Sequence, residues 1–428
     1  MDERGGTPVD RLSIGLVGCG GMGRRHLLAY KALHDVGAYE FEVLAVCDPR
    51  RSVADEAADL AGEFFGRRPA VFFDHAELIA SQAVRALDVV TDPSAHHVVA
   101  VPALRAGLHV ICEKPLGITV RACREMVDAA ADSGTVLATA ENYRRDGPNR
   151  LARAVLEQGL LGEVHLMIET HVGGDDAVVI SPWRHIRESG SIALDMGVHY
   201  TDIFRYYLGE LESVSGSAFV AEPLRVLAAG SSSPVAGIEE VSPGLIRATG
   251  EDSLVALYRT TSGVPIQLAY VPSGSGRRWN QRSVHGRRGS MSVPQDRSGG
   301  AVVVEIAGRT LSGGDLRAEL GGFNLDPLAA LLFGSVGAEY ELSAAAADAA
   351  TVGIELDDFA RAVSAHGQAE VDGLGGLLSV AAAWAVAESD TRGGLVRIAD
   401  VADGTVSTAQ DPVDAVIGLM PKTIGAPA

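Results

Sequence analysis

Three side chains in this sequence could together remove a proton from a hydroxyl group. Lys114 stands in the stretch "EKPLG", directly after the apolar run "HVIC", where a buried strand should end. Asp195 and His199 are four residues apart, so a helix would place both on one face. A histidine accepts a proton near neutral pH, and a nearby carboxylate can orient the ring and stabilise its charged form. These residues suit removal of a hydroxyl proton while a hydride leaves the carbon that bears the hydroxyl.

Each of these residues also has an ordinary structural interpretation. Pro115 lacks an amide hydrogen and could simply end the strand, which would leave Lys114 in a solvated turn. An Asp–His pair at this spacing can be a helix-surface pair, or the Asp can cap a helix. His171, His185 and His199 could instead supply imidazoles to a metal, but their spacing matches no recognised zinc pattern. We therefore expect no metal site.

A glycine-rich turn near the N-terminus indicates a dinucleotide site. "GCGGMG" places Gly18, Gly20 and Gly23 in a G-x-G-x-x-G pattern between the strand-like "LSIGLV" and the helix-like "RRHLLAYKAL". In such a turn the first glycine permits the tight bend, the second leaves room for a pyrophosphate, and the third lets helix and strand pack closely. The positive end of the helix then faces the phosphates. We expect Gly21 and Met22 to lie beside the cofactor as well.

An acidic residue ends the next strand-like segment, "FEVLAVCD". This residue, Asp48, stands close to the offset from the glycines at which a carboxylate accepts hydrogen bonds from the adenosine ribose. Its charge would repel a 2′-phosphate, which favours NAD over NADP. Arg50 and Arg51 follow closely and could accept that phosphate, so NADP stays an alternative.

Short apolar runs and amphipathic stretches alternate through the first third of the chain. Strand-like runs in "LSIGLV", "FEVLAVCDP", "ALDVVTDP", "HVICEKP" and "TVLATA" are separated by helix-length segments. This order predicts a doubly wound parallel sheet with helices on both faces, an α/β Rossmann arrangement. Because ligands of such a sheet bind at the carboxyl ends of its strands, we expect Thr91, Pro93, His97 and Glu113 at the cofactor and Lys114 at its nicotinamide end.

The alternating pattern ends near residue 141, where we place a domain boundary. Residues 1–140 are predicted to form the nucleotide-binding domain and residues 141–428 a second domain of mixed helices and strands. A length of 428 residues is enough for two domains, each with a core of its own.

Three segments of the second domain carry local predictions. "EDSLVALYRTTSGVPIQLAYV" predicts a hairpin of two alternating strands about Ser262 and Gly263. The Gly/Ser-rich stretches at 228–237 and 272–281 are expected to be loops, whereas the Ala-rich "AAAADAA" is expected to be helical. No internal repeat is evident.

Composition restricts the class of protein. A formal net charge of −19 would repel a polyphosphate backbone or an anionic membrane surface, so nucleic-acid and membrane partners are not expected. The first ten residues are charged and polar, and the most apolar windows are too short to span a bilayer. The four cysteines form no Cys-x-x-Cys pair, and we expect them to be reduced and structural. A cytoplasmic protein acting on a small molecule is the prediction.

Taken together, the motifs resemble the Gfo/Idh/MocA oxidoreductases, a family named for glucose–fructose oxidoreductase, inositol dehydrogenase and a rhizopine catabolism protein. The resemblance covers nearly the whole chain. It rests on "GLVGCGGMGRRH", Pro93 and His97 of "DPSAHH", "GLHVICEKPLGIT", "WRHIRESGSIALDMGVHYTDIFRYYLG", "HGRRGSMSV", and "ELDDFARAVSAHG" followed by "GLLSVAAAWAVAES". It implies that Lys114 lies by the nicotinamide and substrate, and that Asp195 and His199 are catalytic or bind substrate. It also implies an α+β second domain with a large, mainly antiparallel sheet that makes homo-oligomer contacts.

The resemblance extends to a set of candidate substrate residues, with one departure. "ENYRRDGPN" is similar to the family's stretch after the last nucleotide-domain strand, and "WRH" is similar to a substrate-side loop. The candidates are Asn142, Tyr143, Arg144, Trp183, Arg184 and His185. Each could equally be packing at the domain interface. The family's usual run of three glycines appears here as "SGSI", so the substrate loop is expected to differ.

The sequence thus predicts an NAD-dependent dehydrogenase that oxidises a secondary hydroxyl of a sugar, an inositol or a sugar derivative. His199 would be the leading proton acceptor, Asp195 would orient it or bind a hydroxyl, and Lys114 would polarise the reacting oxygen; the choice of base between Lys114 and His199 stays open. A redox-neutral, NAD-dependent glycoside hydrolase on the same fold and a non-catalytic dinucleotide sensor are the alternatives. A homodimer or homotetramer is expected.

Overall fold

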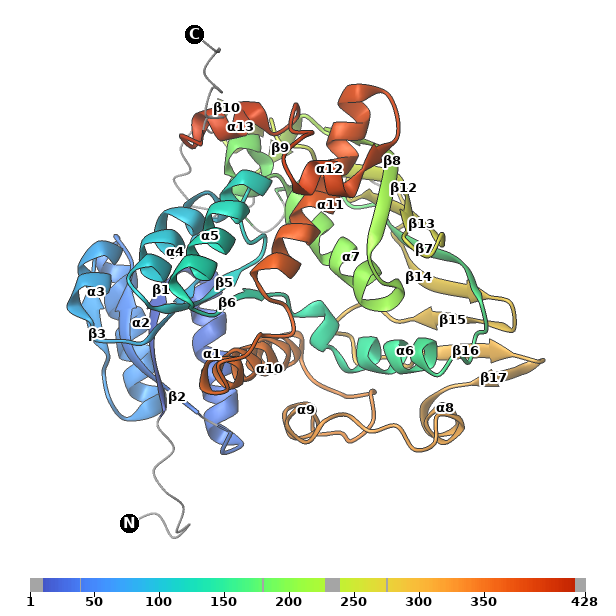
Figure 1. Cartoon of the computed structure of the whole chain (residues 1–428), viewed down its shortest axis with the longest axis horizontal. Coiled ribbons are helices and arrows are strands. Elements are labelled where there is room, and N and C mark those ends of the chain that lie inside the picture. Colours follow the sequence, from blue (N-terminus) through green and yellow to red (C-terminus); the bar gives the residue numbers. More distant parts are fainter. Residues whose placement is uncertain (1–10, 39, 179–180, 228–238, 275, 420–428) are drawn as a thin grey trace.

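The chain folds around two large sheets joined by helices. We describe a computed structural model, which covers residues 11–38, 40–178, 181–227, 239–274 and 276–419. One sheet lies in the N-terminal third and the other in the remainder of the chain (Figure 1).

The N-terminal sheet is parallel throughout and has the strand order β3-β2-β1-β4-β5-β6. Its strands are β1 (Leu12–Val17), β2 (Phe41–Cys47), β3 (Ala70–Phe72), β4 (Ala86–Val89), β5 (His109–Glu113) and β6 (Leu137–Ala140). From β1 the strands are added outwards in one direction through β2 and β3, and then in the other direction through β4, β5 and β6. The boundary between β1 and β4 is therefore the switch point, where a doubly wound sheet binds its ligand. The predicted Rossmann sheet is confirmed.

Helices cover this sheet at each crossover. They are α1 (Gly21–Asp35), α2 (Arg51–Phe65), α3 (His75–Ser81), α4 (His96–Arg105) and α5 (Val120–Ser133), with the short 3-10 helix η1 (Pro93–Ala95) ahead of α4. Side-chain caps begin two of them: Asp74 accepts the amide of Ala76 at α3, and Thr119 accepts that of Ala122 at α5.

The second sheet has nine strands in the order β17-β16-β15-β14-β7-β13-β12-β8-β18. All neighbours are antiparallel except β7 and β13, so the expected large, mainly antiparallel sheet is confirmed. Its strands are β7 (Val164–Val172), β8 (Leu211–Phe219), β12 (Ser253–Thr260), β13 (Pro265–Val271), β14 (Trp279–Gly286), β15 (Gly289–Val293), β16 (Val303–Ile306), β17 (Arg309–Leu311) and β18 (Val396–Arg397). A small separate sheet contains β9 (Leu224–Val226), β10 (Glu239–Ser242) and β11 (Leu245–Arg247).

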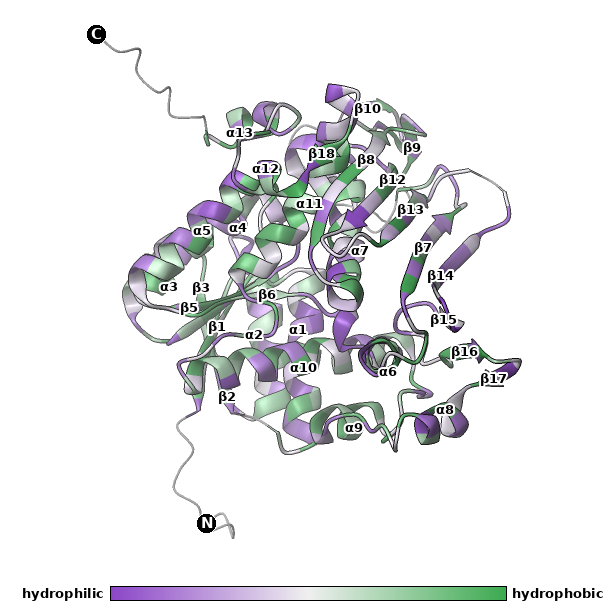
Figure 2. Cartoon of the chain, turned by 45° about the vertical axis from the view of Figure 1, so that its right-hand side comes forward, coloured by the Kyte–Doolittle hydropathy of each residue, from purple (hydrophilic) through white to green (hydrophobic). Residues whose placement is uncertain are grey.

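One long helix connects the two sheets, and a second packs on the nucleotide domain. Helix α11 (Gly373–Arg392) contacts β8 and α7 (Ile192–Leu208) on one side and α5 and β6 on the other. Figure 2 shows that α11 is largely hydrophobic where it lies between the two sheets. Helix α10 (Ala344–Ser364) packs on α1, and its apolar residues share a core with the nucleotide domain. The predicted helix over "AAAADAA" is the first part of α10.

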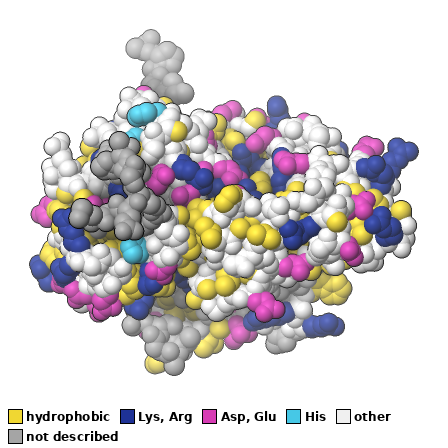
Figure 3. All heavy atoms as spheres, turned by 90° about the horizontal axis from the view of Figure 1, so that it is seen from below, with side chains coloured by type: hydrophobic (Ala, Val, Ile, Leu, Met, Phe, Trp, Pro, Cys, Tyr) yellow, Lys and Arg dark blue, Asp and Glu magenta, His cyan; other side chains and the backbone are white. Residues whose placement is uncertain are grey.

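The remaining helices are short or peripheral. They are α6 (Gly147–Glu157), α8 (Gly313–Glu319), α9 (Pro327–Phe333), α12 (Ile398–Ala402), α13 (Asp411–Val416), and the 3-10 turns η2 (Tyr143–Arg145), η3 (Pro182–His185) and η4 (Arg187–Ser189). None of the helices in the described ranges combines the length and hydropathy needed to cross a bilayer. On the face seen in Figure 3, acidic and basic side chains are interspersed rather than grouped by sign.

Two of the local predictions can be compared with the fold. The hairpin is confirmed, since β12 and β13 pair antiparallel and Gly263 has a φ of +91° in the turn between them. The loop predicted at 272–281 is wrong at its end, because Trp279 begins β14 and pairs with Val172 of β7. A partner distant in sequence decides the conformation there, against the local composition. The stretch 228–237 lies outside the described residues.

Candidate functional site

The glycine turn between β1 and α1 has the geometry that its residue types require. Gly18 has a φ of +97°, and a Cβ there would lie 2.7 Å from the carbonyl carbon of Val90. A Cβ at Gly23 would lie 2.1 Å from the Gly18 oxygen, so only glycine allows this helix to approach the strand. Met22, between these glycines, packs partly buried against the domain core.

The other two glycines of the turn border free space, and an acidic residue lies beside them. A Cβ at Gly21 would meet nothing within 4 Å, and one at Gly20 would meet only the Arg50 guanidinium, at 3.6 Å. The Asp48 carboxylate is buried; it accepts the amide of Cys19 at 3.0 Å and the amide of Arg50 at 2.9 Å. The turn therefore fits a pyrophosphate at the N-terminus of α1, with a carboxylate at the ribose position.

The ends of β4 and β5 are linked by a buried histidine. The His96 ring lies between the carbonyl oxygens of Thr91, 3.1 Å from Nε2, and of Pro115, 2.9 Å from Nδ1. Pro93 begins η1 at the same edge of the sheet. His97 is buried on α4, its Nδ1 has no hydrogen-bond partner, and burial lowers its pKa. Thr91 and Pro93 thus stand at the ligand-binding edge, while His97 lies in the helix that follows.

Lys114 and Asp195 meet across the domain boundary. The Lys114 ammonium lies 2.9 Å from Oδ1 of Asp195 and donates to its backbone oxygen at 3.2 Å. Arg184 donates from Nε to the other carboxylate oxygen at 2.7 Å, and its guanidinium lies 4.1 Å from the ring centroid of Trp183. Burial alone would raise the pKa of Asp195, but the Lys114 and Arg184 charges outweigh it and lower the pKa well below its usual value.

The ring of His199 is held by a glutamate and a tyrosine. Nδ1 of His199 lies 2.7 and 2.9 Å from the two carboxylate oxygens of Glu141, the first residue after β6. The Tyr143 ring stacks on the imidazole, with centroids 3.8 Å apart and planes 2° from parallel. The carboxylate that binds the His199 ring is therefore that of Glu141. Asp195, which was expected to orient the ring, is instead paired with Lys114 and Arg184. Helix α7 presents Asp195 in its first turn to those two cations.

The remaining candidate substrate residues are buried or partly buried, and they differ in whether their polar groups are paired. Arg144 forms an ion pair with Asp202, its Nε lying 2.8 Å from Oδ2. Trp183 is buried beneath the Arg184 guanidinium, and His185 is completely buried. Asn142 is buried with no hydrogen-bond partner on its side-chain oxygen, which makes it an acceptor still to be satisfied at this edge.

Glu113 belongs to a buried cluster beneath Lys114. One of its oxygens accepts the Lys114 amide at 2.9 Å, and the other lies 3.2 Å from Nε2 of His26. Nδ1 of His26 lies 2.8 Å from Asp88. Burial would lower the pKa of His26, but Asp88 and Glu113 outweigh burial and raise it. Glu355 of α10 is buried nearby with both carboxylate oxygens unpartnered, and burial raises its pKa.

Among the described residues, three side chains of this cluster form the one group whose ligating atoms lie close enough together to share a metal ion. The ligating atoms of His26, Glu113 and Glu355 lie within 4.8 Å of one another. The three histidines considered from the sequence do not form such a group in that part of the chain. His26 and Glu113 are hydrogen-bonded to each other and to Asp88 and Lys114, whereas Glu355 has no hydrogen-bond partner and burial raises its pKa.

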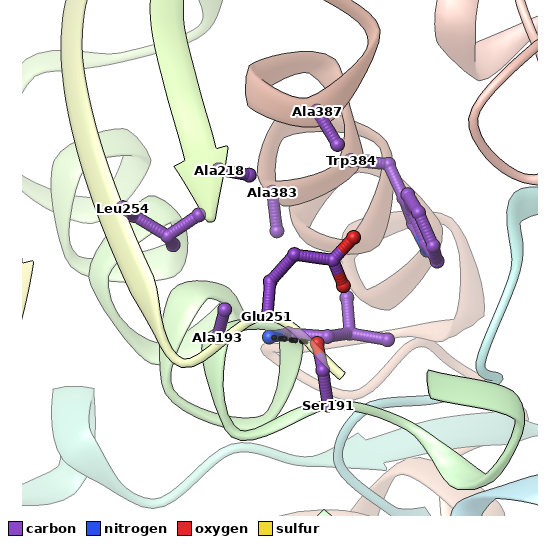
Figure 4. Close-up of a pocket in the computed structure, with 9 residues that line it drawn as sticks. Ser191, Ala193, Ala218, Glu251, Leu254, Ala383, Trp384 and Ala387 are labelled. Atoms are coloured by element: carbon purple, nitrogen blue, oxygen red, sulfur yellow. Dashed lines mark hydrogen bonds between the residues drawn. The ribbon is translucent and has the colours of Figure 1, made fainter. Parts of the chain in front are cut away.

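The small pocket in Figure 4 lies away from these side chains. It is bordered by α7, α11 and the sheet, and its lining is mostly apolar apart from Glu251 and Ser191. The Ser191 hydroxyl accepts the Leu194 amide at 3.2 Å, which caps α7. None of the candidate catalytic residues lines this pocket. The pocket is therefore separate from the group formed by Lys114, Asp195 and Arg184.

Sequence reasoning missed Glu141. The residue follows β6 directly, at the same edge of the sheet where Lys114 follows β5. Because Lys114 and Glu141 both directly follow strands of the parallel sheet, the position of Glu141 after "TVLATA" marks it as a candidate in the same way.

Family models match the chain over both domains. The model described as an oxidoreductase family with an NAD-binding Rossmann fold, GFO/IDH/MocA, matches residues 12–141. The model of the GFO/IDH/MocA C-terminal domain matches residues 149–292. The resemblance predicted from the sequence is confirmed.

Individual relatives agree with this assignment. A levoglucosan dehydrogenase of Pseudarthrobacter phenanthrenivorans is 28% identical over 297 residues, which are 68% of this chain and 75% of the relative. An inositol 2-dehydrogenase of Saccharopolyspora erythraea is 30% identical over 269 residues, which are 62% of this chain and 68% of the relative. A solved levoglucosan dehydrogenase with NADH and L-sorbose has the same fold, with a TM-score of 0.73 at 24% identity over 91% of this chain and 100% of that one. The chain belongs to the Gfo/Idh/MocA family of oxidoreductases, and its residues 12–141 are the NAD-binding Rossmann domain of that family.

Proposed function

We propose that this protein is an NAD-dependent dehydrogenase that oxidises a secondary hydroxyl of a sugar, an inositol or a sugar derivative. The observation that carries the proposal is the Lys114–Asp195 ion pair at the ligand-binding edge of the Rossmann sheet, with His199 one turn further along the same helix as Asp195. The relatives named for levoglucosan and inositol oxidation support a carbohydrate or polyol as the substrate.

The nucleotide-domain residues fit the cofactor. When bound, NAD supplies the acceptor for the hydride that leaves the carbinol carbon. Gly18 and Gly23 shape the turn, Gly20 leaves room for the phosphates, and Asp48 stands where the ribose hydroxyls would donate. The carboxylate of Asp48 favours NAD over NADP.

The hydroxyl proton needs an acceptor and the reacting oxygen needs a donor. Lys114, held as an ammonium against Asp195, can donate to the oxygen as it becomes a carbonyl. His199 has a pKa lowered first by burial and then by the Lys114 charge, so its ring is neutral and can accept the proton. The alcohol thus loses a hydride from carbon and a proton from oxygen, and becomes a ketone.

A substrate screen tests this proposal. The purified protein is incubated with NAD and a panel of free sugars, inositols, anhydrosugars and glycosides, and the absorbance of reduced nicotinamide is followed. We expect one or more free polyols or sugars to produce NADH. A panel that produces none, with correctly folded protein that binds NAD, would contradict the proposal.

We further propose that the protein is a homo-oligomer that associates through the nine-stranded sheet. Helices α7 and α11 pack on one face of this sheet. Strand β12 exposes Val255 and Leu257 on the other face, and Trp279 and Phe219 are exposed on β14 and β8. Exposed apolar side chains gathered on one face favour a partner surface. The cytoplasmic location stays a prediction from the sequence.

A further inference from the structure

Glu141 and His199 form a buried hydrogen-bonded pair that connects the two domains. Glu141 follows the last strand of the nucleotide domain, whereas His199 lies in the second turn of α7. Both side chains are almost fully buried, and both hydrogen bonds between them use Nδ1 of the ring, at 2.7 and 2.9 Å. The other ring nitrogen, Nε2, has no hydrogen bond to Glu141.

The pair is fixed from several directions. Oε1 of Glu141 also accepts the Tyr143 amide at 3.1 Å, and the Tyr143 ring lies flat against the imidazole. The carboxylate and the ring can therefore neither turn nor separate without breaking a hydrogen bond or a stacking contact. The charged groups that act on the pair are Glu113 and Lys114 at the end of β5, Arg144 in η2, Asp195 and Asp202 in α7, Arg297 after β15, and Glu355 in α10.

We propose that Glu141 is a positioning residue for the reaction, which accepts the Nδ1 proton of His199 and thereby leaves Nε2 as the proton acceptor for the substrate hydroxyl. A neutral imidazole carries one proton, and the partner of one nitrogen decides which nitrogen is left to accept. The inference rests on the proposed dehydrogenase function, and it assigns to Glu141 the orienting role that the sequence suggested for Asp195.

The protonation of the pair gives the proposal a pH dependence. Burial raises the pKa of Glu141 to about 7, in spite of the Tyr143 amide and the Lys114 charge. Above that pH Glu141 is a carboxylate, Nδ1 donates to it, and Nε2 can accept. Below that pH Glu141 gains a proton and donates to Nδ1, so the ring proton moves to Nε2. The base at Nε2 is then lost, and oxidation slows as the pH falls through about 7.

Nitrogen NMR of the apo-protein reads the ring directly, independently of turnover. The protein is labelled with ¹⁵N-histidine, and the His199 signals are assigned by their loss in His199→Asn. We expect the proton on Nδ1 at mildly alkaline pH and on Nε2 at mildly acidic pH. A His199 proton that stays on Nε2 at alkaline pH would overturn the proposal.

Two variants with the same substitution separate positioning from a structural role. In Glu141→Gln we expect kcat to fall roughly 10- to 100-fold with little change in KM, and the acid limb of the pH profile to move to lower pH. Glu388→Gln is the matched control: Glu388 is a fully buried glutamate near the C-terminal end of α11 whose carboxylate accepts the Ala409 amide, and the variant should keep the wild-type profile. Glu141→Asp should recover part of the rate, since it restores the carboxylate.

The outcomes distinguish this inference from the function on which it rests. If no polyol is oxidised but the ring proton follows Glu141 as described, the dehydrogenase assignment fails while the pairing stands. If polyols are oxidised and Glu141→Gln keeps the wild-type kcat, pH profile and tautomer, Glu141 has no positioning role. Should Glu141→Gln not fold, the tautomer in the wild-type protein decides alone.

Discussion

At the level of single residues, the site is organised by buried carboxylates that hold cations, an imidazole ring and a backbone turn. Asp195 engages Lys114 and Arg184, Glu141 engages His199, and Asp48 engages the turn that receives the cofactor. Because these acids are buried, their partners are fixed in place before any ligand binds. Because Asp195 has two cationic partners, substitution of one of them should change chemistry more than stability.

Lys114→Met tests the role of the ammonium. The methionine keeps the unbranched stem but cannot donate to the reacting oxygen, so turnover should fall about 100-fold or more. Asp195 keeps its ion pair with Arg184, so we expect only a small decrease in thermal stability. Steady-state kinetics and a thermal melt measure both quantities. A wild-type rate in Lys114→Met would show that "EKPLG" is only a turn.

Asp48→Ala tests cofactor selection. The change removes the acceptor for the ribose hydroxyls and releases Arg50, which is paired with Asp48 at 3.1 Å and could then reach a 2′-phosphate. NAD binding should weaken roughly tenfold or more, and the preference for NAD over NADP should narrow. Titration of both cofactors into Asp48→Ala and Asp48→Asn separates the hydrogen bonds from the charge. Unchanged affinity for both cofactors would remove Asp48 from the site.

At the scale of elements, α10 adds a buried acid to the nucleotide domain. Glu355 is buried with no hydrogen-bond partner, and burial raises its pKa well above the usual value. A carboxyl whose pKa is higher in the folded than in the unfolded state stabilises the fold fully only below its unfolded pKa of about 4.3. That contribution is lost as the pH rises towards the folded pKa.

Glu355→Gln should therefore gain stability relative to the wild type as the pH is raised above about 4.3, since glutamine has no proton to lose. Thermal melts of the two proteins across weakly acidic to weakly alkaline pH measure the difference. Glu56→Gln, at an exposed position on α2, is the control and should show no such trend. A constant difference between Glu355→Gln and the wild type would contradict a neutral buried Glu355.

The elements of the nucleotide domain were predictable because each strand and helix there has a local pattern. β1, β4 and β5 are short apolar runs bounded by turns, and the glycines mark the first connection. The pairing of Glu141 with His199 was not predictable, since it joins β6 to a helix from the other domain. The same limit explains Trp279, whose strand conformation depends on pairing with distant β7.

At the scale of the whole molecule, the open sheet face predicts self-association. Leu257→Asp places a charge on that face, on a β12 side chain that is 55% exposed in the single chain. We expect the wild type to be a dimer or larger by light scattering, and Leu257→Asp to have a smaller mass. Leu331→Asp is the control, because Leu331 is 60% exposed on α9, away from the sheet. A monomeric wild type, or equal masses for both proteins, would contradict the proposed interface.

The dehydrogenase assignment itself depends on whether the hydride removed from the substrate stays on the cofactor when the product is released. A redox-neutral hydrolase would return the hydride to its own substrate, and a sensor would transfer none. The decisive measurement uses a substrate found in the screen, deuterated at the carbinol carbon, with excess NAD and mass analysis of cofactor and product. We predict one deuterated NADH for each ketone formed. Cleavage of a glycoside without accumulation of NADH, at a rate far above the oxidation of any free polyol, would contradict the assignment and leave the family and the cofactor site unchanged.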